Sequence, residues 1–170
     1  MVPMSVLQRN ISVSLLAAMT DAGRFEELAT DVLRASTPAY RNLVHVGVSI
    51  AGKPVPAPVD GIASAAGGAL GLLLAHHTTI AQARLREKWL GQEGDIPKAL
   101  RQCEAARQVT PSLPCTLILT TNGTPSVALI RDAAAATFAA NTSLDIWDVK
   151  RLAQFLDQEP AGQDLRHRYF

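Results

Sequence analysis

A long apolar stretch, bounded by an acidic residue at one end and by two histidines at the other, constrains this chain most. It follows Ala57-Pro58-Val59-Asp60-Gly61 and ends in Ala75-His76-His77-Thr78-Thr79. An uninterrupted apolar strand is typical of a sheet that is covered on both faces, and such strands often carry functional groups where they leave the core. We therefore expect any chemistry of this chain to lie at residues 57–79.

Length and charge set the class of the molecule. The 170 residues suit one domain of ordinary size, and 48% hydrophobic with 18% charged residues predicts a globular fold. A net charge of +1 gives no overall drive toward nucleic acid or an anionic membrane, so any basic surface must be local. The apolar run 61–75 is too short to span a bilayer as a helix, which predicts no membrane contact. Two cysteines without CxxC spacing, Cys103 and Cys115, predict free thiols in a reducing cytoplasm.

Periodicity predicts an alternation of helices and strands. Period-two patterns and turn residues predict three consecutive strands at 44–50, 55–63 and 70–77, and two later strands at 115–120 and 144–147. Helical spacing predicts a turn or two at 5–19 and amphipathic helices from 23 and over 80–90, 96–108, 126–140 and 148–156. The order indicates an α/β fold in which the last two strands flank a parallel crossover helix.

The order of acidic groups is similar to that of a known enzyme superfamily. Phe25-Glu26-Glu27-Leu28 lies in the first turn of a helix, ahead of Pro58-Val59-Asp60-Gly61 at a strand. In this the chain resembles the restriction-endonuclease-like PD-(D/E)xK superfamily, especially its Mrr-type branch. The resemblance implies a central mixed sheet, built of a three-stranded meander plus parallel crossover strands and flanked by helices.

The same resemblance implies a metal site. In such enzymes carboxylates hold Mg²⁺ or Mn²⁺, which activates water, and a lysine supports the attacking group. It implies that Asp60 is a metal ligand and that Glu26 assists it. The family's second acid and its lysine should fall on Ala75 and His77 or on His76 and Thr78, because alternate strand residues share a face.

Neither of those pairs contains a carboxylate or a lysine. An imidazole can ligate a metal or accept a proton, so His76 or His77 is expected to replace part of the motif, and the Thr78 hydroxyl to orient water or phosphate. The candidate catalytic residues are therefore Asp60, His76, His77 and Thr78, and the candidate metal ligands are Asp60, Glu26 and His77.

Basic residues follow the histidines directly. Arg84, Arg86 and Lys88 lie in the next helix and are candidates for contacts with the DNA backbone. The alternative is a solvated helix face, partly paired by Glu87.

A second resemblance covers most of the chain. Residues 40–61, 75–79, 88–90, 145–148 and 155–157 look like those of amino-terminal effector domains on bacterial STAND-type ATPases linked to antiphage defence. This implies an effector domain at 1–157, a linker at 158–170 toward an ATPase domain, and homo-oligomerisation on activation.

Together these features predict a metal-dependent, nuclease-like effector domain that acts on DNA as a phosphodiesterase. The alternative is a catalytically degenerate member of the same fold that binds nucleic acid or a protein partner, or that serves in oligomerisation, without cleavage.

Overall fold

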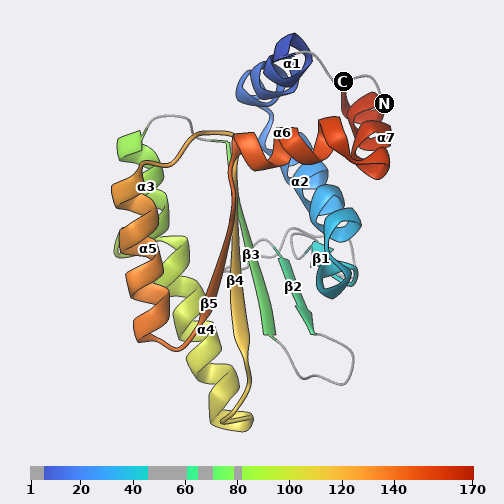
Figure 1. Ribbon diagram of the computed structural model, residues 1–170. Coiled ribbons are helices and arrows are strands. Elements are labelled where there is room, and N and C mark those ends of the chain that lie inside the picture. The colour runs from blue at the N-terminus through green and yellow to red at the C-terminus, as the bar shows by residue number, and fades with distance from the viewer. Residues whose placement is uncertain (1–5, 46–60, 65–70, 79–81) are drawn as a thin grey trace.

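The computed structural model describes residues 6–45, 61–64, 71–78 and 82–170, and Figure 1 shows the arrangement of their helices and strands. Asp60 and Thr79 lie outside these ranges. The elements, in chain order, are α1 (Val6–Ala17), α2 (Ala22–Ser36), the 3₁₀ turn η1 (Pro38–Tyr40), β1 (Val44–His45), β2 (Gly61–Ser64), β3 (Gly71–His77), α3 (Gln82–Leu90), α4 (Asp95–Val109), β4 (Cys115–Thr121), α5 (Val127–Ala139), β5 (Ser143–Trp147), α6 (Val149–Gln158) and α7 (Pro160–Tyr169).

The strands form one sheet in the order β1-β2-β3-β4-β5. β1 pairs with β2 and β2 with β3 in antiparallel fashion, whereas β3, β4 and β5 run parallel. The expected α/β class is confirmed, as is the parallel crossover through α5. The turns expected between the first three strands fall within 46–60 and 65–70, outside the described residues, so the meander and the restriction-endonuclease-like core stay predictions.

Helices cover both faces of the sheet (Figure 1). On one face α1, α2, α6 and α7 pack around a core that includes Ile118 of β4. On the other face α3, α4 and α5 pack around a second core that includes Leu117 and Leu119. Alternate residues of β4 therefore point into different cores, which explains why this strand is apolar along most of its length. Among the helices that the structure describes, none is both long and apolar enough to cross a membrane.

Two helices begin one residue earlier than the sequence predicts. Asp21 accepts a hydrogen bond from the backbone of Arg24 and caps α2, which begins at Ala22. Glu26 and Glu27 therefore lie beyond the first turn of the helix, whereas the sequence places them within it. α4 likewise begins at Asp95, with Gly94 in the cap position, so Asp95 lies inside the helix and does not precede it.

The tail expected to be a linker is a helix over most of its length. α7 packs against α2 and α6, and its Leu165 is buried in the first core. Gly162 lets the two helix backbones approach, since an added Cβ would lie 2.0 Å from the Phe155 carbonyl oxygen. Residues 160–169 are thus part of the folded body, because an apolar side chain and a backbone without a Cβ allow them to dock.

The turn after β4 ties the sheet to the first helix. The buried Asn122 side chain donates hydrogen bonds to the carbonyl oxygens of Leu16 (2.9 Å) and Met19 (2.8 Å), at the end of α1. Its backbone N–H donates to the His77 carbonyl oxygen at 3.2 Å. The turn at Asn122-Gly123 therefore satisfies carbonyl groups at a helix end, which lack intrahelical partners.

Candidate functional site

The carboxyl ends of the three parallel strands meet at one edge of the sheet. His77 ends β3 and lies opposite Thr121 of β4, while Trp147 ends β5 opposite Thr120. In open α/β sheets, ligands bind outside this edge because helices and loops leave a crevice there. The edge is therefore the first place to look for a site, and it contains one of the histidines that the sequence singled out.

His77 forms a pair with an acid from the next layer. Its Nε2 contacts the Asp95 carboxylate at the first residue of α4. The two side chains are only 14% and 17% exposed, so the contact is largely shielded from water. With Nε2–H donating to Asp95, a neutral imidazole has Nδ1 as its proton acceptor. The pair thus has the parts of a general base held in orientation by a carboxylate.

A cavity of about 660 Å³ opens beside this pair. Arg84 and Lys88, one helical turn apart on α3, line it together with Lys98 of α4. Three cations near an oriented imidazole suit an anionic ligand, and a volume of this size falls within the range of small-molecule sites. The remaining lining is the acids Glu87, Glu93 and Asp95 with Gly91 and Gln92.

The acidic residues that line the cavity do not all neutralise its basic residues. Asp95 is engaged by His77, and Glu93 lies 3.6 Å from the Arg101 guanidinium on α4. Glu87 is exposed on the same helix as Lys88. The cavity therefore offers positive groups from two helices, while two of its three carboxylates already have partners.

The predicted basic cluster is split by the structure. Arg86 pairs with Asp132 of α5 at 2.8 Å, away from the lining of the cavity. The hydrogen bond from Arg86 lowers the pKa of Asp132. Two residues from Arg84 or Lys88, Arg86 is turned by about 200° around the helix, which explains the separation. The structure therefore brings together Arg84 and Lys88 but not Arg86.

The structure describes the positions of the other candidate residues in less detail. Residue 76 pairs with Thr120 in the strand register, while Thr78 follows β3 directly and is half-buried. Glu26 is half-buried on α2, in the layer opposite the one that supplies Asp95. Asp60 is outside the described residues.

A metal site is not assembled from the part of the chain that the structure describes. There, no three His, Cys, Asp or Glu side chains are grouped so that they could hold an ion. Glu26 lies on α2, which covers one face of the sheet, whereas His77 contacts Asp95 of α4, which covers the other face, so these two residues do not by themselves start a ligand set. The described residues thus do not fit a three-ligand metal centre, and the role of Asp60 stays a prediction.

Sequence reasoning missed Asp95 and Lys98 as site residues. They are three residues apart in the first turns of α4, so they share one side of that helix. Asp95 followed by Lys98 at the start of a helix is a weak signal, since such acids commonly interact with the helix dipole. The contact between Asp95 and His77 depends on the turn between α3 and α4, which the sequence does not reveal.

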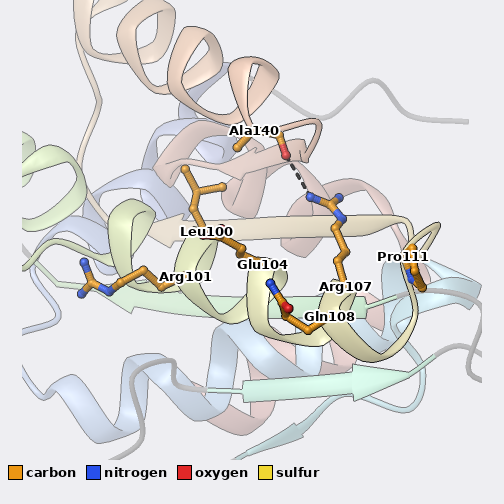
Figure 2. A pocket seen from close by; sticks show the side chains of 7 residues that line it. All are labelled: Leu100, Arg101, Glu104, Arg107, Gln108, Pro111 and Ala140. Carbon is orange, nitrogen blue, oxygen red and sulfur yellow. Dashed lines mark hydrogen bonds between the residues drawn. The ribbon is translucent and has the colours of Figure 1, made fainter.

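A second cavity, of about 640 Å³, lies along α4 (Figure 2). Its most prominent cation, Arg107, donates hydrogen bonds to the carbonyl oxygens of Leu113 (3.1 Å), Ala140 (2.9 Å) and Asn141 (2.7 Å). This guanidinium therefore joins the ends of α4 and α5, and its role is structural.

Another acid, Asp145 of β5, is also engaged by structural contacts. Tyr40 Oη (2.6 Å), Trp147 Nε1 (3.1 Å) and an Arg151 guanidinium nitrogen (2.5 Å) all donate to its carboxylate. Burial raises the pKa of Asp145, but these hydrogen bonds outweigh burial and hold the pKa below its usual value. The cluster fixes the end of the sheet to η1 and α6.

Both cysteines are free and buried, as expected. Burial, followed by a hydrogen bond with Cys115, raises the pKa of Cys103 to about 12. Because the thiolate is the nucleophilic form, such a thiol is unreactive at neutral pH. The cysteines are therefore core residues.

Comparison with protein-family models gave no match, and comparisons with curated proteins and with solved structures found no similar protein.

Proposed function

We propose that this chain is a nuclease-like effector domain that acts on the phosphodiester backbone of DNA, with the cavity at the end of β3 as its phosphate site. One observation carries the proposal: the shielded His77–Asp95 pair lines the same cavity as Arg84, Lys88 and Lys98. An oriented base beside phosphate-binding cations is the minimum that hydrolysis of a phosphodiester requires.

The residues that line the cavity can bind the phosphate and supply a general base. Cations from α3 and α4 bind the non-bridging phosphate oxygens. Nδ1 of His77 takes a proton from water as the water oxygen forms a bond to phosphorus, while Asp95 stabilises the resulting imidazolium. The bond to the leaving oxygen then breaks, and that oxygen takes a proton from solvent.

A divalent ion remains part of the proposal as a separate prediction. Mg²⁺ or Mn²⁺ bound at Asp60 would supply charge stabilisation at the phosphate. Titration of Mn²⁺ into the purified chain, followed by calorimetry, tests this directly. Asp60→Ala should abolish the binding heat, and Glu26→Gln should weaken it. An unchanged heat in the Asp60 variant would remove this ion from the proposal.

The same proposal includes the full-length protein, its location and its activation. A STAND-type ATPase domain downstream in the same polypeptide, a cytoplasmic location and activation by oligomerisation are proposed from the resemblance of residues 75–79 and 145–148 to such effector domains.

The alternative function is DNA or protein binding without cleavage. It is favoured by the lack of a three-ligand metal group among the described residues and by the absence of a lysine at positions 75–78. DNA binding with cleavage and DNA binding without cleavage would both use the cavity, and they differ in whether the bound DNA is cut. One set of variants therefore distinguishes them.

The experiment measures DNA binding by fluorescence anisotropy over a range of salt concentrations, together with nicking of plasmid DNA in Mg²⁺ or Mn²⁺. Lys88→Ala and Lys98→Ala should each weaken binding and reduce the salt slope by about one. Arg86→Ala is the matched control, because Arg86 is exposed on the same helix but lies outside the cavity.

The nicking assay tests the role of His77 as the general base. His77→Ala should abolish nicking while leaving DNA affinity within about threefold, and Asp95→Asn should reduce the rate by about 10²-fold or more. Binding without nicking by the unmodified protein would favour the binding module. If Arg86→Ala and Lys98→Ala had equal effects on affinity, the cavity would not be the phosphate site.

A further inference from the structure

The outer face of α5 carries large apolar side chains. Phe138 is 86% exposed and Val127 is 83% exposed. They are about three helical turns apart and therefore lie on the same side of the helix. Between them this side presents Arg131, whose side chain is 74% exposed, and the small residues Ala134 and Ala135. Apart from Arg131 this side of the helix is uncharged, whereas surface helices normally place several charged residues outward, so it has the composition of a contact surface.

A hollow lies directly beside Phe138. It has a volume of about 510 Å³ and is formed by the end of α5, the following turn and the start of β5, the edge strand of the sheet. Its lining is uncharged: Ala134, Thr137, Phe138 and residues 141–144. An exposed aromatic ring and an uncharged hollow of suitable size are thus neighbours on one face.

The hollow is held open by a well-defined turn. Asn141 has a φ of 52°, in the left-handed region, and its N–H donates to the Phe138 carbonyl oxygen at 3.0 Å. Thr142 N–H donates to the Thr137 carbonyl oxygen at 2.9 Å, and this pattern of bonds is typical of a helix end closed by a left-handed residue. The shape of the hollow is therefore set by the backbone.

Charge on this face does not oppose contact with an identical face. Arg131 and Asp132 are the only charged residues of α5. They lie 3.3 Å apart, and Asp132 is also paired with Arg86 at 2.8 Å. Two copies of this face would therefore meet without a concentration of charge of one sign.

We propose that the α5 face, defined as Val127, Arg131, Ala134, Ala135, Phe138 and the hollow beside Phe138, binds the same face of a second copy of this chain. The protruding ring and the hollow are adjacent, so one two-fold axis between them inserts each Phe138 into the hollow of the other copy. Such an interface is self-complementary and closes at the dimer. This surface would serve the oligomerisation included in the proposed function, but its test measures association alone and can fail while the DNA assays succeed.

The size of the face predicts a weak dimer. α5 is about 20 Å long and a helix with its side chains is about 10 Å wide, so the face with its hollow covers at most about 400 Å² per copy. The total of about 800 Å² is below the 1,200 Å² or so that stable specific interfaces bury. Association is therefore expected to be weak and transient.

Sedimentation equilibrium of the whole chain from about 1 μM to about 1 mM tests the proposal. The average mass should rise from monomer to dimer over this range. Phe138→Glu should weaken association at least about tenfold, as expected for an aromatic anchor. Ser143→Arg, which adds a charge at the rim of the hollow, should have a similar effect.

Val109→Glu is the matched control, because Val109 is also 86% exposed but lies at the end of α4. It should leave association unchanged. Circular dichroism confirms that each variant is folded. A protein that is monomeric at the highest concentration, or a dimer that is insensitive to Phe138→Glu, overturns the proposal.

Discussion

Replacing Asp157 by alanine should destabilise the fold more than any change to an exposed acid of the chain. Its side chain is 2% exposed at the end of α6. The carboxylate accepts a hydrogen bond from the Ser12 hydroxyl on α1 and one from the Arg166 guanidinium on α7 at 2.7 Å. One buried carboxylate therefore joins three helices.

The expected loss follows from these two contacts. Each hydrogen bond to a charged group contributes about 1.5–3 kcal/mol, and removal of one partner from a buried ion pair costs about 3–5 kcal/mol. Arg166 is 30% exposed, so water can replace part of its lost contact. We therefore expect a decrease of about 3 kcal/mol in the free energy of unfolding, which lowers Tm by about 6–12 °C for a chain of this size.

Urea unfolding followed by circular dichroism measures this decrease. Asp164→Ala is the control, because Asp164 is an exposed acid on α7, and its effect should stay within about 0.5 kcal/mol. Asp157→Asn keeps the shape of the side chain and separates loss of charge from loss of packing. A decrease below about 1 kcal/mol in Asp157→Ala would show that the three helices are held by apolar packing alone.

Three further changes test other parts of the fold. Gly162→Ala should cost about 2–3 kcal/mol in urea unfolding, because the new Cβ would meet the Phe155 carbonyl oxygen, and a smaller loss would mean that α7 can shift. Asn141→Ala should cost about 1 kcal/mol whereas Asn141→Gly should not, since only glycine adopts a φ of 52° without strain; equal Tm values would refute this. The folded-state pKa of Asp145 is lowered from 3.8, so its stabilisation is present at neutral pH and is lost as the pH falls through and below that value. Asp145→Asn should therefore be less stable than the unmodified protein at about pH 7, and the difference should shrink at about pH 3, as measured by unfolding at both pH values.

Much of the helical and strand pattern was predictable because it depends on local periodicity. α2, β4 and α6 have apolar residues at the spacing of their element, and Asp21 and Asp148 cap the two helices as their residue types suggest. α7 was not predictable in this way. It is short and polar and contains glycine, so its helical state depends on docking against α6, which the sequence does not encode locally.

The site was predictable only at its strand end. The position of His77 follows from the abrupt end of an apolar strand, whereas its pairing with Asp95 depends on the corner between α3 and α4. The separation of Arg86 from Lys88 follows from helix geometry once the helix is assigned. The role of Asp60 lies outside the described residues and stays a prediction, as does that of the His76 side chain.

Asn122 gives the molecule a mechanical property that its secondary structure does not show. Because its side chain binds the end of α1 and its backbone binds His77, the first helix and the edge of the sheet at the end of β3 share one buried connector. Opening of this connector would release both at once. Amide hydrogens at the end of α1 should therefore exchange with deuterium at the same free energy as those at the end of β3, as one cooperative unit.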